Sequence, residues 1–203
     1  MKLAVLVSGR GTNLFNIIKK HEDGFLRSEV AVVISDHQCE AVERSRQAGI
    51  QTRVLDPRSF ASEVEFGKKL LDILRECEID FVVLAGFLKR IPEIVVESFK
   101  NRIINIHPAL LPSFGGKGMY GLKVHQAVLD YGCKISGVTV HVVDFEYDHG
   151  PVVLQKCVPV ESTDTPESLA ERIHRVEYDI LPEAIKLFED RAIRIEGRRV
   201  FHA

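Results

Sequence analysis

Short apolar runs alternate along the chain with segments whose apolar residues recur at helical spacing. The apolar runs predict buried strands at Lys2–Val7, Val30–Ser35, Thr52–Leu55, Phe81–Ala85, Arg102–His107, Ile135–Val143 and Val152–Val158. Helical spacing begins at Leu14 and recurs over Ala41–Ala48, Val64–Cys77, Leu122–Leu129 and Pro166–Glu189, with a short helix expected after Pro92. Because runs apolar on both faces are typical of strands buried between helices, the pattern predicts an α/β fold. We expect a Rossmann-like, doubly wound, mostly parallel sheet with helices on both faces.

The chain has 203 residues, enough to bury one sizeable core, and no linker, repeat or low-complexity segment interrupts the pattern. We therefore expect a single domain over residues 1–203. Pro182 lies inside the last helical segment and is expected to kink or break it. The tail, Ile193–Phe201, has the pattern of a hairpin with its turn at Glu196-Gly197.

Composition and charge argue against several classes of protein. Hydrophobic residues make up 45% and charged residues 28% of the chain, as in an ordinary globular protein. A formal net charge of −2 disfavours a nucleic-acid partner. No apolar run approaches about 20 residues, so we expect no membrane partner. The four cysteines are widely separated, which indicates reduced thiols and a cytoplasmic location.

A glycine-rich turn, Ser8-Gly9-Arg10-Gly11-Thr12-Asn13, joins the first strand to the first helix. Such a turn directs backbone N–H groups at one spot, where the positive end of the helix dipole also lies, and this arrangement suits a phosphate. An equally good interpretation is a tight turn with a Thr or Asn helix cap. Because Leu14 stands where a dinucleotide fingerprint has its third glycine, a monophosphate is favoured over NAD.

Asn105 and His107 lie two residues apart at the end of an apolar strand, so their side chains leave the same face. Pro108 restricts His107 to an extended conformation, which places the pair at the carboxyl edge of the sheet, where open α/β folds bind ligands. Taken alone, the motif is more often a strand-end histidine with a structural role.

Asp148, in Asp148-His149-Gly150-Pro151, adds a carboxylate, with Asp144 and Glu146 as alternatives if the turn is shifted. Together, an amide, an imidazole and a carboxylate provide what acyl transfer needs, namely stabilisation of an oxyanion, a proton donor and a group that holds the imidazole charged. We expect the carboxylate to raise the pKa of His107 above its usual value.

The chain resembles the folate-dependent formyltransferases, and most closely the branch that acts on glycinamide ribonucleotide. The resemblance rests on Ser8–Leu14 (SGRGTNL), Leu84–Lys89 (LAGFLK), Asn105–Pro112 (NIHPALLP) and Gly137–Val143 (GVTVHVV) followed by DHGP. It covers essentially the whole chain. It implies transfer of the formyl group of N10-formyltetrahydrofolate, as co-substrate, to the amine of glycinamide ribonucleotide in purine biosynthesis. Its partners would then be these small molecules, with a monomer or homodimer as the assembly.

The resemblance also implies roles for particular residues. Asn105, His107 and Asp148 would be catalytic, the N-terminal part of the chain would bind the nucleotide, and the C-terminal part would bind folate and carry catalysis. The residues expected to hold the nucleotide substrate are Gly11, Thr12, Asn13, Pro108 and Glu177. Those expected to line the folate site are Glu63, Leu88, Lys89, Arg90, Ile91 and Asn105. Glu63 stands where relatives carry a basic residue, and the loop Gly115–Gly121 is longer than in some of them.

The remaining histidines do not predict a metal site. None has a metal-ligand spacing such as H-E-x-x-H, so we expect no metal. His141 is expected to make structural hydrogen bonds within its strand. The alternatives are a methionyl-tRNA formyltransferase or a formyltetrahydrofolate deformylase, both disfavoured by the length of the chain, and a non-catalytic nucleotide-binding module.

Overall fold

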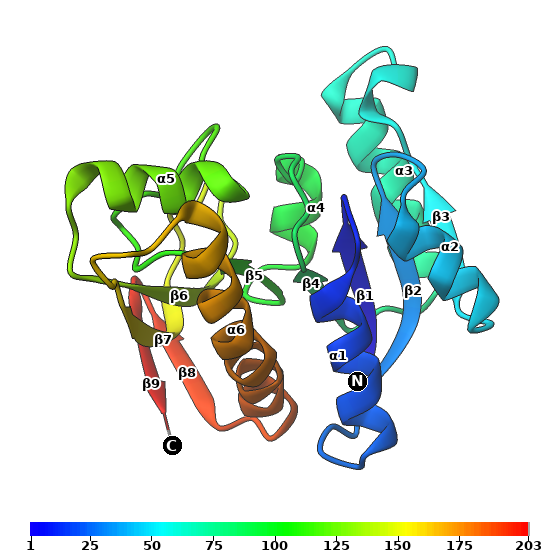
Figure 1. The fold of residues 1–203 in the computed structure, drawn as a ribbon. Coiled ribbons are helices and arrows are strands. Elements are labelled where there is room, and N and C mark those ends of the chain that lie inside the picture. The colour runs from blue at the N-terminus through cyan, green and yellow to red at the C-terminus, as the bar shows by residue number, and fades with distance from the viewer. Residues whose placement is uncertain (203) are drawn as a thin grey trace. The chain divides into compact units, whose positions relative to one another are not determined.

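A computed structural model describes residues 1–202 of the chain (Figure 1). The Cα positions group into two compact units, Met1–Ile104 and Asn105–Ala203. Within the described residues, no helix is both long enough and apolar enough to cross a membrane.

Four parallel strands form the sheet of the first unit. They are β1 (Lys2–Val7), β2 (Glu29–Ser35), β3 (Gln51–Val54) and β4 (Phe81–Leu84), in the order β3-β2-β1-β4. The pairs β1–β2, β1–β4 and β2–β3 are all parallel. Every residue of β4, and all of β1 after Lys2, is buried. Because these strands are parallel, the carboxyl ends of β1, β2 and β4 lie at one edge of the sheet. The buried side chains of β1 and β4 form part of the core.

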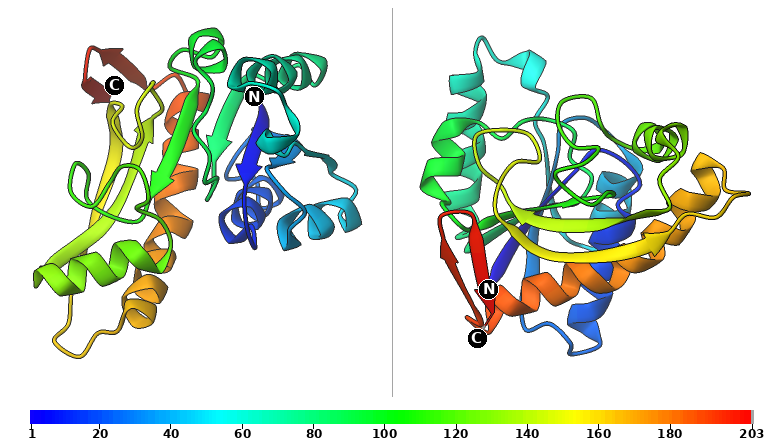
Figure 2. Two further views of the ribbon diagram at one scale, coloured as in Figure 1. Left: turned by 90° about the horizontal axis from the view of Figure 1, so that it is seen from above. Right: turned by 90° about the vertical axis from the view of Figure 1, so that its left-hand side faces the viewer.

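The helices of the first unit cover both faces of this sheet. α1 (Thr12–Glu22) and α2 (Glu40–Gln47) connect strands in one direction, whereas α3 (Glu63–Glu76) returns across the sheet to β4. Because crossovers between parallel strands are right-handed, α1 and α2 lie on one face and α3 on the other (Figure 2). The short η1 (Pro57–Ser59) precedes α3, and α4 (Glu93–Ser98) packs beside α3.

In the second unit a long antiparallel pair packs against a long helix. β6 (Ile135–Val142) pairs antiparallel with β7 (Val152–Pro159), and α6 (Pro166–Glu189) packs on both strands and on α5 (Leu122–Tyr131). β5 (Ile103–His107) spans the boundary of the two units. The chain ends in the hairpin β8 (Ile193–Glu196) and β9 (Arg199–His202), whose second strand lies beside β7.

These elements confirm the predicted α/β class with a mostly parallel sheet and helices on both faces. The predicted strands, helices and C-terminal hairpin are all present, with ends shifted by a few residues. Of the expected kink or break at Pro182, the break is wrong, because α6 continues from Pro166 to Glu189 through the buried proline. Proline removes one backbone donor from the helix, and the apolar face of α6 against β6 and β7 outweighs that loss.

Candidate active site

Asn105 and His107 follow the alternation predicted for β5. Ile104 and Ile106 are buried in the core, while Asn105 is half-buried and His107 is 3% exposed. The loop after the strand is tied to β6, since Thr139 Oγ1 donates to the carbonyl of Ala109 and accepts from the backbone N–H of Leu111. The end of β5 thus presents its two polar side chains from a fixed backbone.

Both N–H groups of the Asn105 side chain are engaged. Nδ2 donates to Asp148 Oδ1 at 3.2 Å and lies 3.1 Å from His141 Nε2. His141 Nδ1 lies 2.9 Å from the carbonyl oxygen of Val142, which can only accept, so Nδ1 carries the proton. His141 Nε2 faces this amide nitrogen and also Asp148 Oδ1, which is 3.6 Å away. The orientation of the amide follows from its partners, because a carboxylate oxygen requires the nitrogen to face it.

His107 lies between a backbone carbonyl and the carboxylate. Nε2 donates to the carbonyl oxygen of Phe114 at 2.8 Å, and Nδ1 lies 3.6 Å from Asp148 Oδ2. A neutral His107 therefore carries its proton on Nε2, and Nδ1 is the nitrogen that gains or loses a proton. A proton on Nδ1 would point at a carboxylate. This geometry suits an imidazole that accepts a proton and passes it on.

Asp148 is held by a tight turn with an unusual backbone. Its φ is 53°, in the left-handed region that residues other than glycine seldom adopt. Oδ2 accepts from the backbone N–H of Gly116 at 2.8 Å. A Cβ atom on Gly150 would lie 1.8 Å from the carbonyl oxygen of Val142, so only glycine allows the turn to approach β6 this closely. The surrounding structure thus fixes the carboxylate beside Asn105 and His107.

The electrostatics of the cluster differ from the expectation for His107. Burial lowers the pKa of His107 below its ordinary value, although the charge of Asp148 and the contact with Phe114 act in the opposite direction. The predicted rise is therefore wrong, because removal of the imidazolium from water outweighs its attraction to one carboxylate. Burial would raise the pKa of Asp148, but His141, His107 and the Gly116 N–H together lower it. The resting cluster favours a neutral imidazole next to a carboxylate.

The two alternative carboxylates lie elsewhere in the turn. Asp144 Oδ2 is 2.7 Å from His149 Nδ1, and Asp144 Oδ1 accepts from the backbone N–H of Glu146. Asp148 is thus the carboxylate that contacts the imidazole of His107. Its catalytic role stays a prediction.

In the first unit, the glycine-rich turn forms the start of α1 with Gly11 as its N-cap. Gly11 has φ 74°, and a Cβ atom there would lie 2.7 Å from that of Ala41. The interpretation with a Thr or Asn cap is wrong, since the capping residue is a glycine and provides no side-chain cap. Thr12 and Asn13 are instead the first two residues of the helix. The N-terminus of α1 therefore suits an anion.

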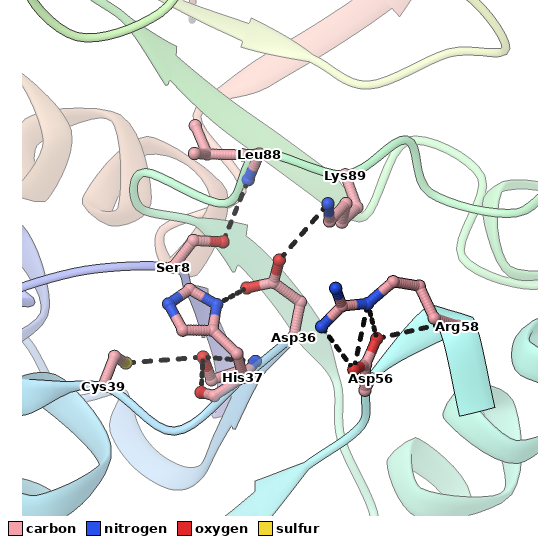
Figure 3. A network of polar contacts seen from close by, with 9 residues as sticks. Ser8, Asp36, His37, Cys39, Asp56, Arg58, Leu88 and Lys89 are labelled. Atoms are coloured by element: carbon pink, nitrogen blue, oxygen red, sulfur yellow. Dashed lines mark hydrogen bonds and ion pairs between the residues drawn. The ribbon is translucent and has the colours of Figure 1, made fainter.

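The segment expected to line the folate site follows β4 and is tied to the same turn (Figure 3). Ser8 Oγ accepts from the backbone N–H of Leu88 at 3.1 Å, and Lys89 Nζ lies 3.8 Å from Asp36 Oδ2. Leu88 is 42% exposed, whereas Ile91 is buried. The turn after β1 and the segment after β4 thus support each other.

Glu63 forms an ion pair with one member of this segment. Its Oε1 accepts from Arg90 Nη2 at 2.8 Å, and Glu63 is the first residue of α3. The contact of Glu63 with folate stays a prediction.

The other expected substrate residues lie in the second unit. Pro108 is half-buried directly after His107, and Glu177 is buried in α6. Their roles stay predictions. Sequence reasoning missed His141, the carbonyl of Phe114 and the N–H of Gly116 as partners of the trio. His141 was recognisable only as a polar residue inside an apolar strand, and the two backbone groups carry no sequence signal.

Among residues 1–202, no group of three or more His, Cys, Asp or Glu side chains is arranged to hold a metal ion. The polar groups of the cluster are instead bonded to one another.

Comparisons with known proteins agree with this geometry. Residues 1–185 match the model of the formyl transferase family. The chain is 35% identical to a phosphoribosylglycinamide formyltransferase of Haemophilus influenzae, over 98% of this chain and 92% of that protein. It is 44% identical to a chloroplastic phosphoribosylglycinamide formyltransferase of Arabidopsis thaliana, over 91% of this chain and 64% of that protein.

A solved structure is similar over the whole chain. The crystal structure of glycinamide ribonucleotide transformylase 1 from Symbiobacterium toebii has a TM-score of 0.93 and 41% identity, covering all of this chain and 93% of that one. This likeness agrees with the Rossmann-like fold. The chain belongs to the formyl transferase family, in its phosphoribosylglycinamide formyltransferase branch. It spans less than two thirds of the Arabidopsis relative, which is longer.

Proposed function

We propose that the protein transfers the formyl group of N10-formyltetrahydrofolate to the amine of glycinamide ribonucleotide, a step of purine biosynthesis. The observation that carries the proposal is the cluster of Asn105, His107 and Asp148 within hydrogen-bond or ion-pair distance, in a chain of this family. An amide, a neutral imidazole and a carboxylate supply the groups that acyl transfer requires.

In the proposed reaction the substrate amine attacks the formyl carbon, and a new C–N bond forms while the carbonyl oxygen becomes an oxyanion. His107, neutral at rest, accepts the surplus proton of the amine on Nδ1. The negative charge on Asp148, 3.6 Å away, stabilises the resulting imidazolium. His107 then donates that proton to the departing N10 of the folate as the C–N10 bond breaks. The products are the formylated amine and tetrahydrofolate.

Stabilisation of the oxyanion is assigned to the amide of Asn105 and to the positive charge of protonated His107, whose Nε2–H stays on the Phe114 carbonyl. Because the two N–H groups of Asn105 are engaged with Asp148 and His141, one of those contacts must be exchanged when the substrate binds.

Each unit provides further binding residues in this proposal. In the first unit, Gly11, Thr12 and Asn13 hold the phosphate at the N-terminus of α1, and the segment from Leu88 to Ile91 binds the folate. In the second unit, Pro108 and Glu177 contact the nucleotide substrate. The proposal includes one functional domain over residues 1–203, a cytoplasmic location, a monomer or homodimer, and no nucleic-acid or membrane partner.

The test follows consumption of N10-formyltetrahydrofolate with and without glycinamide ribonucleotide. Consumption that requires the ribonucleotide, with formylated ribonucleotide as product, is the expected result. Consumption by water alone would identify a deformylase, and binding of the ribonucleotide without any turnover would identify a nucleotide-binding module. Either of these outcomes overturns the proposal.

A further inference from the structure

A chain of contacts joins the C-terminal hairpin to the turn that carries Asp148. Arg198 lies in the turn between β8 and β9, and its Nη2 donates to the carbonyl oxygen of His149 at 2.6 Å. Its Nη1 lies 3.0 Å from His149 Nε2. His149 Nδ1 in turn lies 2.7 Å from Asp144 Oδ2. Arg198 thus contacts His149, at one end of the segment from Asp144 to His149, and is connected to Asp144, at the other end, through the His149 ring.

Arg198 Nη1 also lies 3.4 Å from His149 Nδ1, so it does not lie along the lone pair of Nε2 but close to the ring as a whole. A guanidinium only donates, and its hydrogen bond in this chain of contacts is the one to the His149 carbonyl oxygen. The carboxylate oxygen of Asp144 accepts from His149 Nδ1. The ring of His149 is held on both sides, although half of its side chain is exposed.

The hairpin that presents Arg198 is itself attached to the second unit. His202 Nε2 lies 3.1 Å from the carbonyl oxygen of Val153, and β9 lies beside β7. Arg198 therefore extends from an anchored element, and its contacts connect the turn to β7 through β9.

The position of Asp148 depends on these contacts, because Asp148 lies in the chain between Asp144 and His149. It directly precedes His149 and has the unfavourable left-handed backbone conformation. Its two carboxylate oxygens must face Asn105 and His107 at the same time. A small rotation of this turn would withdraw the carboxylate from the imidazole.

We propose that Arg198, acting through His149 and Asp144, is a positioning residue that keeps the Asp148 carboxylate against His107. This inference rests on the proposed function for the role of Asp148. Arg198 follows the segment matched by the formyl transferase family, which ends at residue 185. The inference therefore assigns a contribution to catalysis to a hairpin outside the matched region.

The test compares Arg198→Ala with Arg199→Ala in the full chain. Arg199 is a matched control because it is a neighbouring exposed arginine of the same hairpin, and its guanidinium lies over the ring of Phe201. The first measurement is the NMR titration of the His107 ring, identified by the signal that His107→Gln loses. The second is steady-state kinetics of formyl transfer.

We expect Arg198→Ala to lower the pKa of His107 relative to the unchanged protein, since the carboxylate that favours the imidazolium moves away. We expect kcat to fall about fivefold or more, because small displacements of catalytic groups are costly, with KM changed less than about twofold. Arg199→Ala should match the unchanged protein in both measurements. If Arg198→Ala does not fold, Arg198→Gln, which shortens the side chain less, replaces it.

A His107 pKa that is the same in Arg198→Ala as in the unchanged protein would overturn the positioning role, whatever the kinetics show. The same lowering in Arg199→Ala would also overturn it, since the effect would then come from the charge of the hairpin. If the unchanged protein does not transfer formyl groups, the proposed function fails, and the titration still decides whether Arg198 positions Asp148.

Discussion

The Nδ1 atom of His107 lies 3.6 Å from Oδ2 of Asp148, and its Nε2 atom donates to a backbone carbonyl. The two ring nitrogens therefore have different roles. One nitrogen keeps its proton and orients the imidazole, and the other is left to titrate against a carboxylate. The pH dependence of the proposed reaction should follow this second nitrogen.

Removal of either polar residue of β5 should abolish most of the activity. Loss of one oxyanion donor typically costs about 10²–10³ in kcat, and we expect Asn105→Ala and His107→Ala to lose at least this much while remaining folded. Circular dichroism and thermal unfolding check the fold, and single-turnover kinetics measure transfer. Near-normal turnover of either variant would show that the proposed roles are wrong.

Asp148→Asn should change the pH profile as well as the rate. Neutral His107 accepts a proton in the proposed reaction, so kcat should fall on the acidic side as His107 becomes protonated. Because burial lowers the pKa of His107, this acidic limb should lie below about pH 6.5. Asp148 raises that pKa, so Asp148→Asn should move the limb to still lower pH. Profiles of kcat from pH 4.5 to 8 measure both positions, and an unmoved or raised limb contradicts this role of Asp148.

The turn before α1 provides a matched pair of glycine substitutions. Gly11→Ala places a methyl group 2.7 Å from Ala41 Cβ at a residue with φ 74°, whereas a Cβ on Gly9 meets nothing within 4 Å. We expect Gly11→Ala to destabilise the protein by about 1–3 kcal/mol. It should also raise KM for glycinamide ribonucleotide. Urea denaturation and kinetics of both variants measure these effects, and equal stability of Gly9→Ala and Gly11→Ala would contradict the packing argument.

Stability should fall in mild acid because of His125 in α5. Burial, with the charges of His174 and His107, lowers the pKa of His125 to about 4. The unfolded chain, with a histidine pKa near 6.5, binds more protons between about pH 6.5 and 4, so folding weakens as the pH falls through this window. At pH 4.5 the loss from this residue is about 2–3 kcal/mol.

His125→Gln tests this dependence. The difference in unfolding free energy between pH 7 and pH 4.5 should be smaller in this variant by about 2–3 kcal/mol. The substitution His21→Gln, at an exposed histidine of α1, is the control for loss of a histidine outside the core, and His125→Gln should reduce the difference by more than this control does. An identical pH dependence of His125→Gln and the unchanged protein would show that the buried imidazole does not govern acid stability.

Much of the site follows from sequence because its main determinants are local. The two-residue spacing of Asn105 and His107 fixes a common face of one strand, and the turn-forming residues around Asp148 identify which carboxylate approaches. The apolar runs likewise define the strands, since a parallel sheet must be buried on both faces.

What the sequence left out depends on long-range packing. The direction in which the pKa of His107 shifts depends on how deeply the ring is buried, and no local motif reveals this burial. The contact of Arg198 with His149 joins residues 49 positions apart through exposed side chains, so no hydrophobic pattern marks it. The continuity of α6 through Pro182 likewise reflects tertiary packing, which overrides the local preference of proline.

The acceptor that His107 uses at position 114 belongs to the main chain. Substitution of the phenylalanine side chain would therefore leave the acceptor in place, and the imidazole would keep the same tautomer. Insertion or deletion of a residue between His107 and Phe114 would instead move the carbonyl away. The length of this loop therefore matters more for the imidazole than the side chain at position 114, although the left-handed backbone of Phe114, with φ 54°, disfavours β-branched residues there.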